Sequence, residues 1–304
     1  MRIAQIGSGH GHAAGKWRAL SSNPDVDAVV QVEPADASTV LADPSIVAVA
    51  VETRNHQSLS VARTAVDAGK HLWFDKPAGD DFAAFAAVMR EAAARKLHVQ
   101  MGYMFRYSPA FVYVADAVKA GQVGDVFALR AHMSTNVNLA ERTEQSRHRG
   151  GILYDLGGHM IDQVVWLLGR PDRVDAVLRN DATPELPGYA DNTLAVFEYA
   201  HALVSIEIAA MAAPPTARRF EAYGTRGSAM LEPFDGAQRV VLTHGGAQTV
   251  MGMPEVNRQT LYDRELVAFV GVLRGQQAPD RSPEHELLVQ ETLLRTTGTL
   301  GNQA

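Results

Sequence analysis

Three side chains in this sequence have the types and spacing of acid–base machinery. Lys76 lies in "FDKPAG", and Asp155 and His159 are four residues apart in "LYDLGGHM". Residues four apart share one face of a helix, so the carboxylate could orient the imidazole and stabilise its protonated form. Histidine can accept a proton near neutral pH, and a lysine ammonium can stabilise a developing alkoxide. The set predicts proton removal from an alcohol, although each pattern alone is more often structural.

A glycine-rich stretch, "IGSGHGHAAGK", predicts a phosphate-binding turn. Gly7 and Gly9 follow an apolar run and precede a helical stretch, the context in which Gly-x-Gly indicates dinucleotide binding. The match is partial because His12 occupies the third position of the fingerprint, where a small residue is usual. A Walker A loop is excluded, since His10 and Trp17 stand where glycine and Ser or Thr are required. The predicted cofactor-binding residues of this turn are Gly7, Ser8, Gly9, His10, Gly11 and His12.

The histidines of this turn leave a second interpretation open, because His10 and His12 could share a metal ion. The sequence has no other tight histidine cluster to complete such a site, so we expect no metal. Glu33, 21 residues beyond His12, favours the nucleotide instead. A carboxylate at about that distance accepts hydrogen bonds from the adenosine ribose and repels a 2′-phosphate. The sequence therefore favours NAD over NADP, with a solvated loop glutamate as the alternative.

The elements that must carry these residues alternate between short apolar runs and helical stretches up to residue 107. The runs "RIAQI", "VDAVVQV", "SIVAVAV", "HLWF" and "LHVQMG" predict five parallel strands of a doubly wound, Rossmann-type sheet. Only thirteen residues, Glu33 to Ser45, join the second strand to the third, and they include Pro34 and Pro44. We expect a loop there with at most a turn or two of helix.

A second domain is predicted over residues 108–304, after a first domain over residues 1–107. The alternating segments "DVFALRAHMS", "DRVDAVLRN", "NTLAVFEYA", "LVSIEIAAM" and "RRFEAYG" predict a large, mostly antiparallel sheet with one solvated face, within an α+β domain. The predicted helices of this domain follow Ser108 and Pro109 up to Gly121, span about Ile152 to Leu168, and close the chain at roughly Thr260 to Arg274 and Glu284 to Thr297.

Composition excludes several classes of protein. The 304 residues contain no cysteine, which excludes disulfide scaffolds, thiol catalysis and thiolate metal sites. The net charge of −6 is mild, so neither a nucleic acid nor an anionic membrane is an expected partner. No apolar run reaches the roughly 18 residues of a membrane span. Because the N-terminus shows no signal-peptide pattern, a cytoplasmic location is expected.

Several stretches occur in an order that resembles the Gfo/Idh/MocA family, named for glucose-fructose oxidoreductase, inositol dehydrogenase and rhizopine catabolism. These are "IGSGHGHAAGK", "AGKHLWFDKPAGDD", "GGILYDLGGHMIDQVVWLLG", "EAYGTRGSAMLEP" and "ELVAFVGVLRGQQAP". The resemblance implies an NAD(P)-dependent oxidoreductase that acts on a sugar, cyclitol or related polyol. It also implies a homodimer or homotetramer formed through the C-terminal sheet.

The resemblance assigns roles residue by residue. The family's Glu-Lys-Pro motif is Asp75-Lys76-Pro77 here, and its Asp-x-x-x-His pair is Asp155 and His159. Two departures follow the third strand, where Arg54 replaces a proline and Glu52 stands where a small residue is usual. Further cofactor-binding residues implied by the family are Thr53, Asn55, His56, Asp75 and Lys76, and further substrate-binding residues are Lys76, Tyr103, Arg106, His148 and Arg149, besides the Asp-His pair.

Two other functions remain open. The short linker between the second and third strands and the altered loop after the third are compatible with a catalytically inactive dinucleotide-binding regulator or sensor. Some relatives instead use bound NAD for transient oxidation during glycoside cleavage. The retained Lys76, Asp155 and His159 favour the dehydrogenase.

Replacing Lys76 or His159 by alanine is expected to lower turnover about a hundredfold or more, in line with the usual contribution of acid–base and electrostatic groups. Turnover is measured as reduced nicotinamide formed from a panel of polyols. Near-normal rates in both variants would show that the catalytic assignment is wrong.

Overall fold

The computed structural model describes residues 1–301 and divides the chain into two compact units. The first unit comprises Met1–Met104 and Arg258–Gln290, and the second comprises Phe105–Asn257 and the chain from Glu291 onward. The sequence pattern predicts one division at residue 107, which assigns the closing helices to the second domain. The structure groups residues 258–290 with the first unit instead, because one of these helices packs on its first helix.

The first unit is built on a five-stranded parallel sheet in the order β2-β1-β3-β4-β5, which confirms the predicted Rossmann-type sheet. Its strands are β1 (Arg2–Ile6), β2 (Ala28–Val32), β3 (Ile46–Val51), β4 (His71–Phe74) and β5 (Val99–Met101). Ile6 pairs with both Val32 and Val51, and Val51 pairs with Phe74. The residues that follow these four strand ends therefore share the carboxyl edge of the sheet, where open α/β sheets bind ligands.

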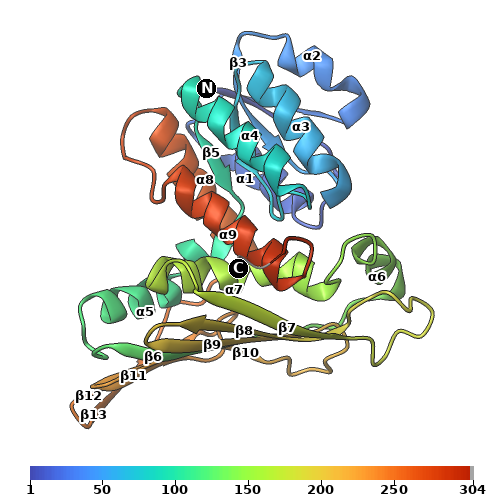
Figure 1. Cartoon of the computed structure of the whole chain (residues 1–304). Helices are drawn as coiled ribbons and strands as arrows, with labels where there is room; N and C mark the ends of the chain where they lie inside the picture. Colours follow the sequence, from blue (N-terminus) through green and yellow to red (C-terminus); the bar gives the residue numbers. More distant parts are fainter. Residues whose placement is uncertain (302–304) are drawn as a thin grey trace. The chain divides into compact units, whose positions relative to one another are not determined.

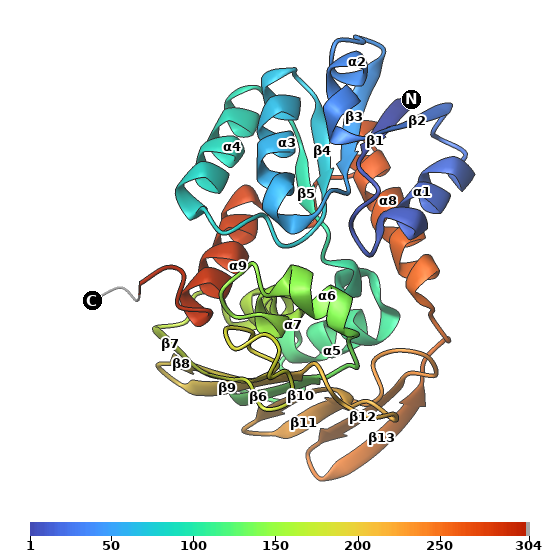
Figure 2. The ribbon, with the colours of Figure 1, turned by 90° about the vertical axis from the view of Figure 1, so that its right-hand side faces the viewer.

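Helices flank both faces of this sheet (Figure 2). The helices α3 and α4 lie on one face, and α1 and α8 lie on the other. The predicted loop with little helix between β2 and β3 is confirmed as a short 3-10 turn, Pro34–Asp36, followed by one five-residue helix, α2. The helices are α1 (Ala13–Ser22), α2 (Ala37–Leu41), α3 (Asn55–Asp67), α4 (Phe82–Ala94), α8 (Arg258–Leu273) and the first part of α9 (Pro283–Thr296).

Helices α1 and α8 approach each other closely because α1 carries a glycine at the contact. A Cβ atom added to Gly15 would lie 2.6 Å from Cδ2 of Tyr262 on α8. On the same helix, Leu266 and Phe269 are fully buried, and Phe269 stacks on Trp73 of β4 at 6.5 Å. The apolar face of α8 is thus part of the core of the first unit.

The second unit is built on an eight-stranded sheet in the order β13-β12-β11-β10-β6-β9-β8-β7. All described neighbours are antiparallel except β6 and β9, so the predicted mostly antiparallel sheet is confirmed. The strands are β6 (Val126–Met133), β7 (Arg173–Arg179), β8 (Asn192–Tyr199), β9 (Ala202–Ala209), β10 (Arg218–Gly224), β11 (Gly227–Leu231), β12 (Arg239–His244) and β13 (Ala247–Gly252).

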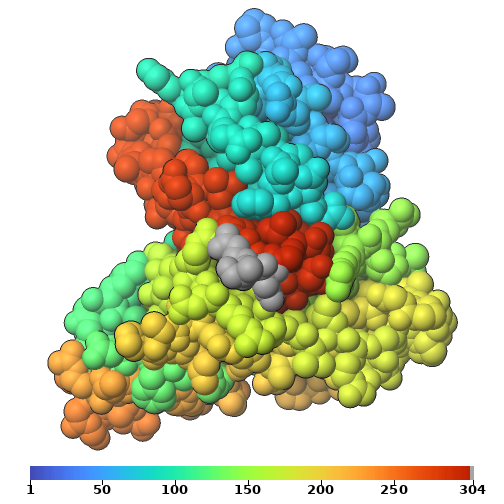
Figure 3. Space-filling model, viewed as in Figure 1, coloured from blue at the N-terminus to red at the C-terminus, as the bar shows by residue number. Residues whose placement is uncertain are grey.

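One face of this sheet carries helices and the other is open (Figure 1). The covering helices are α5 (Pro109–Lys119), α6 (Leu139–Gln145) and α7 (Ile152–Leu168), and α7 has the predicted bounds. The open face exposes large apolar side chains, including Val177 and Leu203, each more than half exposed. The loop between β7 and β8 lies at the surface of this unit (Figure 3, yellow). Within residues 1–301, no helix has the length and apolarity needed to cross a membrane.

Replacing Gly15 by alanine tests the contact between α1 and α8. Alanine favours the helix by about 1 kcal/mol, but overpacking against Tyr262 costs about 1–3 kcal/mol, so we expect net destabilisation. The free energy of unfolding from urea titration measures it. Combination with Tyr262→Leu should remove the penalty, and a Gly15→Ala variant more stable than the parent would contradict the close contact.

Candidate functional site

The turn after β1 depends on glycine at its first position. Gly7 has φ +92°, and a Cβ atom there would lie 2.7 Å from Cγ2 of Thr53. The N–H of Gly7 donates to the carbonyl of Val32 at 2.8 Å, which holds the turn against β2. Gly11 is exposed, and no atom would lie within 4 Å of a Cβ there. The backbone at Gly11 is therefore accessible to a ligand just before α1 begins at Ala13.

Two predicted cofactor residues meet beside this turn. The Ser8 hydroxyl donates to Oε1 of Glu33 at 2.6 Å, and both side chains are exposed. They come together because β1 and β2 are adjacent and end in register. An exposed carboxylate next to a glycine-rich turn has the placement needed to accept ribose hydroxyl hydrogen bonds.

Other backbone amides of the turn have partners within the protein. The N–H of His10 donates to the carbonyl of Glu52 at 3.0 Å, and the N–H of His12 donates to Nδ1 of His10 at 3.2 Å. His12 is the N-cap of α1 and makes no side-chain capping bond. The helix dipole still gives this end positive potential, but two N–H groups are engaged in the structure.

A buried ion cluster that the sequence analysis does not predict lies behind the turn. Lys16, on α1, is fully buried, and its Nζ is 3.1 Å from Oε1 of Glu52 and 3.2 Å from Oδ2 of Asp75. Oε2 of Glu265 on α8 is 4.0 Å away, and the ring centroid of Trp73 is 4.3 Å away. Glu52 follows β3 and Asp75 follows β4, so one ammonium joins carboxylates from three elements.

The two histidines of the turn contact the same carboxylate. Nδ1 of His12 is 2.9 Å from Oδ2 of Asp75, and Nδ1 of His10 is 3.2 Å from the same oxygen. Nδ1 of His10 is also 3.7 Å from Oε2 of Glu52. Their rings pack edge to face at 4.7 Å. His12 is thus accommodated at the third position of the fingerprint by a contact with Asp75, the residue before Lys76.

Burial and unequal numbers of opposite charges shift the pKa values of this cluster. Burial lowers the pKa of Lys16, but the three carboxylates outweigh it and raise the pKa above its usual value. Burial raises the pKa of Asp75, yet the histidines and Lys16 hold it well below its usual range. Burial dominates for the other acids and raises the pKa of Glu52 to about 7 and that of Glu265 to about 8. For His12, burial lowers the pKa to about 4, so its imidazole is neutral at neutral pH.

The remaining predicted residues of the first unit surround the ends of β3, β4 and β5. Lys76 is buried, its backbone N–H donates to Oδ1 of Asp75 at 2.7 Å, and the Lys76–Pro77 peptide bond is cis. Thr53 is buried, whereas His56, in the first turn of α3, is exposed. Asn55 begins α3. Tyr103 is buried, and the guanidinium carbon of Arg281 lies 5.8 Å from its ring centroid.

In the second unit, Asp155 and His159 lie one helical turn apart on α7. Gln145, at the end of α6, donates from Nε2 to Oδ2 of Asp155 at 2.9 Å. The hydroxyl of Tyr189 donates in turn to Oε1 of Gln145 at 2.5 Å. His159 is buried, with its ring edge to face against Phe105 at 5.2 Å. The sequence analysis does not predict the contacts of Gln145 and Tyr189. These residues lie on a helix and a loop outside the Asp-His motif, and no local pattern marks them.

Two of the predicted substrate residues are buried and have partners within the second unit. Arg106 is buried, with Nη2 2.5 Å from Oδ1 of Asp162 and its guanidinium 4.4 Å from the Trp166 ring. His148 is also buried and stacks on Tyr154 at 4.4 Å. Arg149 is exposed on the loop before α7.

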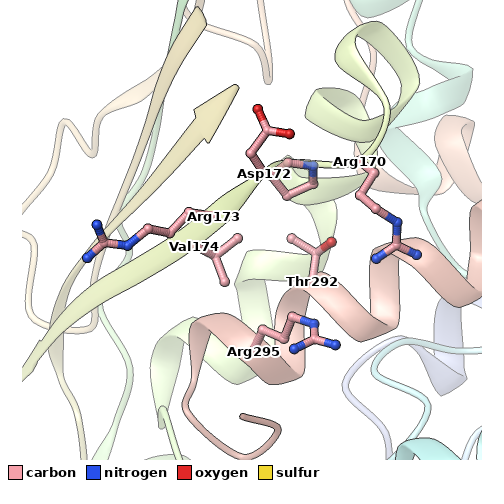
Figure 4. Close-up of a pocket in the computed structure, with 7 residues that line it drawn as sticks. Arg170, Asp172, Arg173, Val174, Thr292 and Arg295 are labelled. Atoms are coloured by element: carbon pink, nitrogen blue, oxygen red, sulfur yellow. The ribbon is translucent and has the colours of Figure 1, made fainter. Parts of the chain in front are cut away.

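None of the predicted site residues lines a pocket of about 200 Å³ in the second unit (Figure 4). Arg170, Arg173 and Arg295 line it, but each is paired with an acid. Arg170 and Arg295 both contact Glu291, at 2.8 and 2.9 Å, and Arg173 contacts Asp175 at 2.8 Å. Because each guanidinium already has a carboxylate partner, we do not assign an anion site to this pocket.

Comparison with known proteins gives a family and a fold. Residues 111–230 match the model of the GFO/IDH/MocA C-terminal domain, which confirms the resemblance. The chain is 32% identical over 221 residues to the uncharacterized oxidoreductase ORF334 of Rhizobium meliloti, covering 68% of this chain and 63% of that protein. It is 29% identical over 162 residues to levoglucosan dehydrogenase of Pseudarthrobacter phenanthrenivorans, covering 50% and 40%. The match thus spans less than two thirds of the length of these relatives.

Solved structures share the fold over almost the whole chain. An oxidoreductase domain protein from Kribbella flavida matches with a TM-score of 0.83 at 19% identity, covering 98% of this chain and 96% of that one. An oxidoreductase from Agrobacterium radiobacter, solved with NAD+, L-tartaric acid and magnesium, matches with a TM-score of 0.81 at 15% identity and the same coverages. At these identities the likeness establishes the fold alone.

Replacing Lys16 by methionine tests the buried cluster. Removing one partner of a buried ion pair costs about 3–5 kcal/mol, because the remaining charges lose their compensation. We expect a loss in the free energy of unfolding of that size in urea titrations at neutral pH. Adding Asp75→Asn should recover about 1 kcal/mol or more, because it removes the partner carboxylate that stays ionised at neutral pH. Strictly additive effects would contradict a direct coupling.

Proposed function

The chain carries a GFO/IDH/MocA C-terminal domain, and from this premise we propose that it is an NAD(P)-dependent oxidoreductase. The proposed reaction transfers a hydride between nicotinamide and a secondary alcohol carbon of a sugar, cyclitol or related polyol. The likeness to a levoglucosan dehydrogenase and the NAD+ bound by the Agrobacterium radiobacter protein support this class of substrate and cofactor. The cytoplasmic location expected from the sequence is part of the same proposal.

The glycine-rich turn is the observation that carries the proposal. Gly7 adopts a backbone conformation that favours glycine, Gly11 is open to solvent, and α1 begins two residues later. Such a turn at the carboxyl edge of a parallel sheet fits a pyrophosphate. The exposed Glu33, held by Ser8, fits the ribose hydroxyls of NAD and would repel the additional phosphate of NADP.

The chain's own residues then have distinct roles in the proposed reaction. When bound, a nicotinamide supplies the hydride acceptor or donor. His159 would take the hydroxyl proton on an imidazole nitrogen as the carbonyl forms, and Asp155 would stabilise the imidazolium. Lys76 would stabilise the developing negative charge on the substrate oxygen. Gln145, which donates to Asp155 and is itself held by Tyr189, would fix the carboxylate as a positioning residue.

The proposed activity is tested directly with purified protein, NAD or NADP, and a panel of sugars, cyclitols and their acids. Formation of reduced nicotinamide with at least one free polyol is the expected result. It would also argue against glycoside cleavage through transient oxidation, in which no net reduced cofactor is released. No turnover with any member of the panel, despite dinucleotide binding, would favour the regulator described next.

A catalytically inactive dinucleotide-binding regulator is the second candidate. It is favoured by the short connection between β2 and β3, which holds one five-residue helix, and by Glu52 and Arg54 in the loop after β3, where the family pattern has other residues. A thermal-shift titration with NAD and with NADP separates the possibilities. Stabilisation without turnover would support the regulator, and no stabilisation by either dinucleotide would contradict both candidates.

We also propose that a second copy of the chain covers the open face of the eight-stranded sheet. Val177 and Leu203 expose more than half of their surface there, and apolar patches of this kind commonly mark interfaces between proteins. A homodimer or homotetramer would bury them. A monomeric mass in analytical ultracentrifugation would contradict this assembly.

Replacing Glu33 by alanine tests the cofactor preference. Loss of a charged acceptor for the ribose hydroxyls should weaken NAD about tenfold, while NADP, no longer repelled, should gain relative to NAD. Dissociation constants from calorimetry measure both effects. Glu185→Ala, which removes an exposed glutamate of the second unit, is the control for net charge. Unchanged affinities for both dinucleotides in the Glu33 variant would show that Glu33 does not contact the ribose.

A further inference from the structure

Three side chains of the first unit offer metal-binding atoms at one point. His10, His12 and Asp75 each direct one ligand atom there, and these atoms lie within 4.8 Å of one another. The two segments are far apart in the sequence but meet at the carboxyl edge of the sheet. The sequence analysis expects no metal because it finds no third ligand near the histidines; folding supplies one in Asp75.

The separations between these atoms suit a small tetrahedral ion. Ligand atoms about 2.0–2.2 Å from a zinc ion in tetrahedral geometry are about 3.3 Å from one another. Oδ2 of Asp75 is 2.9 Å from Nδ1 of His12 and 3.2 Å from Nδ1 of His10. These two separations are within a few tenths of an ångström of that value, and the imidazole ligand atoms lie within 4.8 Å of each other. Nδ1 of His10 would exchange the hydrogen bond from the His12 N–H for the ion.

Glu52 provides an independent indication of a ligand. Its side chain is fully buried, and among the described residues its Oε2 accepts no hydrogen bond. Oε1 forms the ion pair with Lys16, whereas Oε2 lies 3.7 Å from Nδ1 of His10. Buried carboxylates are normally hydrogen-bonded or coordinate a metal. Oε2 is therefore placed to act as a fourth ligand or to accept a hydrogen bond from a metal-bound water.

The charges around this point also favour a cation. Glu52, Asp75 and Glu265 face the single ammonium of Lys16. Lys76 also acts electrostatically on both histidines, yet three carboxylates still outnumber two ammonium groups. Burial of excess negative charge is costly unless protons or a cation compensate it. The raised pKa values of Glu52 and Glu265 indicate that protons compensate part of this charge, and a divalent ion bound by neutral imidazoles would take their place.

We propose that His10, His12 and Asp75 bind a divalent transition-metal ion of the zinc class, with Glu52 or a water as the fourth ligand. Two imidazoles and one carboxylate form a donor set used by zinc sites with one open position. The imidazole nitrogens select such an ion over magnesium or calcium. A bound ion would join the glycine-rich turn to the residue preceding Lys76. The site does not depend on the proposed oxidoreductase activity.

The proposal is tested by calorimetric titration of ZnCl2 into the full chain, freed of affinity tags and treated with EDTA. We expect one equivalent to bind, and we expect His12→Ala and Asp75→Asn each to weaken binding about 100-fold or more, since each removes a ligand rather than an outer contact. His201→Ala removes an exposed histidine in the turn between β8 and β9 and should leave the affinity unchanged. Magnesium chloride should give no comparable binding.

Cobalt provides a readout that needs no variant. Co2+ bound by the unmodified chain should give the intense visible absorption of a tetrahedral site, displaced by one equivalent of Zn2+. Circular dichroism shows whether each variant is folded, and if one is not, the cobalt spectrum decides. No one-equivalent binding by the parent chain, or equal binding by both folded variants, would overturn the proposal. Dinucleotide binding is measured in separate titrations, so failure of the metal site is distinguishable from failure of the proposed function.

Discussion

One buried ammonium group determines how the carboxyl edge of the parallel sheet is organised. Lys16 lies within 4.0 Å of carboxylates that follow β3, follow β4 and extend from α8. Each of these carboxylates would be strongly destabilised in the interior without a counter-charge. The strand ends, the first helix and a helix distant in sequence are therefore tied together by electrostatics as well as by apolar packing.

The same arrangement explains why the glycine-rich turn tolerates two histidines. The third position of a dinucleotide fingerprint normally needs a small residue for close packing between helix and strand. Here Gly15 provides the close approach instead, one turn later and toward α8. His12 is directed to Asp75, a carboxylate shorter by one methylene than the family's glutamate. His12 and Asp75 depart from the family pattern at positions far apart in the sequence, but in the structure their side chains contact each other within one cluster.

Local patterns predicted the fold well where one face of an element is buried. The helix Ile152–Leu168 and the strands β6 to β10 follow from apolar periodicity, and the burial of β9 alternates along its whole length. The strand β13 was missed because nearly all of its residues are exposed, so no alternation marks it. Helix α6 is not predicted because it is short and polar, and only Gln145 of its seven residues is buried, so no apolar periodicity marks it.

The candidate site was predictable only in part. Motifs identified the turn, Lys76 and the Asp-His pair, because their residues are close in sequence. Neither the role of Lys16 nor that of Glu265 could be predicted, since pairing between charges on distant elements leaves no local pattern. The hydrogen bond from Gln145 to Asp155 also joins two different helices and leaves no local pattern in the sequence. The substrate role of Arg106 rests on the resemblance, and no sequence pattern predicts the contacts of its guanidinium with Asp162 and Trp166.

The first unit is assembled from two stretches of chain separated by most of the second. The side-chain amide of Gln100 donates to the carbonyl of Glu265, and the N–H of Met101 donates to Oε1 of Glu286. A ribosome making this chain releases β5 long before either acceptor exists. Part of the core of the first unit, and these two hydrogen bonds, therefore cannot form until α8 and α9 emerge. The unit that begins first is not complete until most of the second has been made.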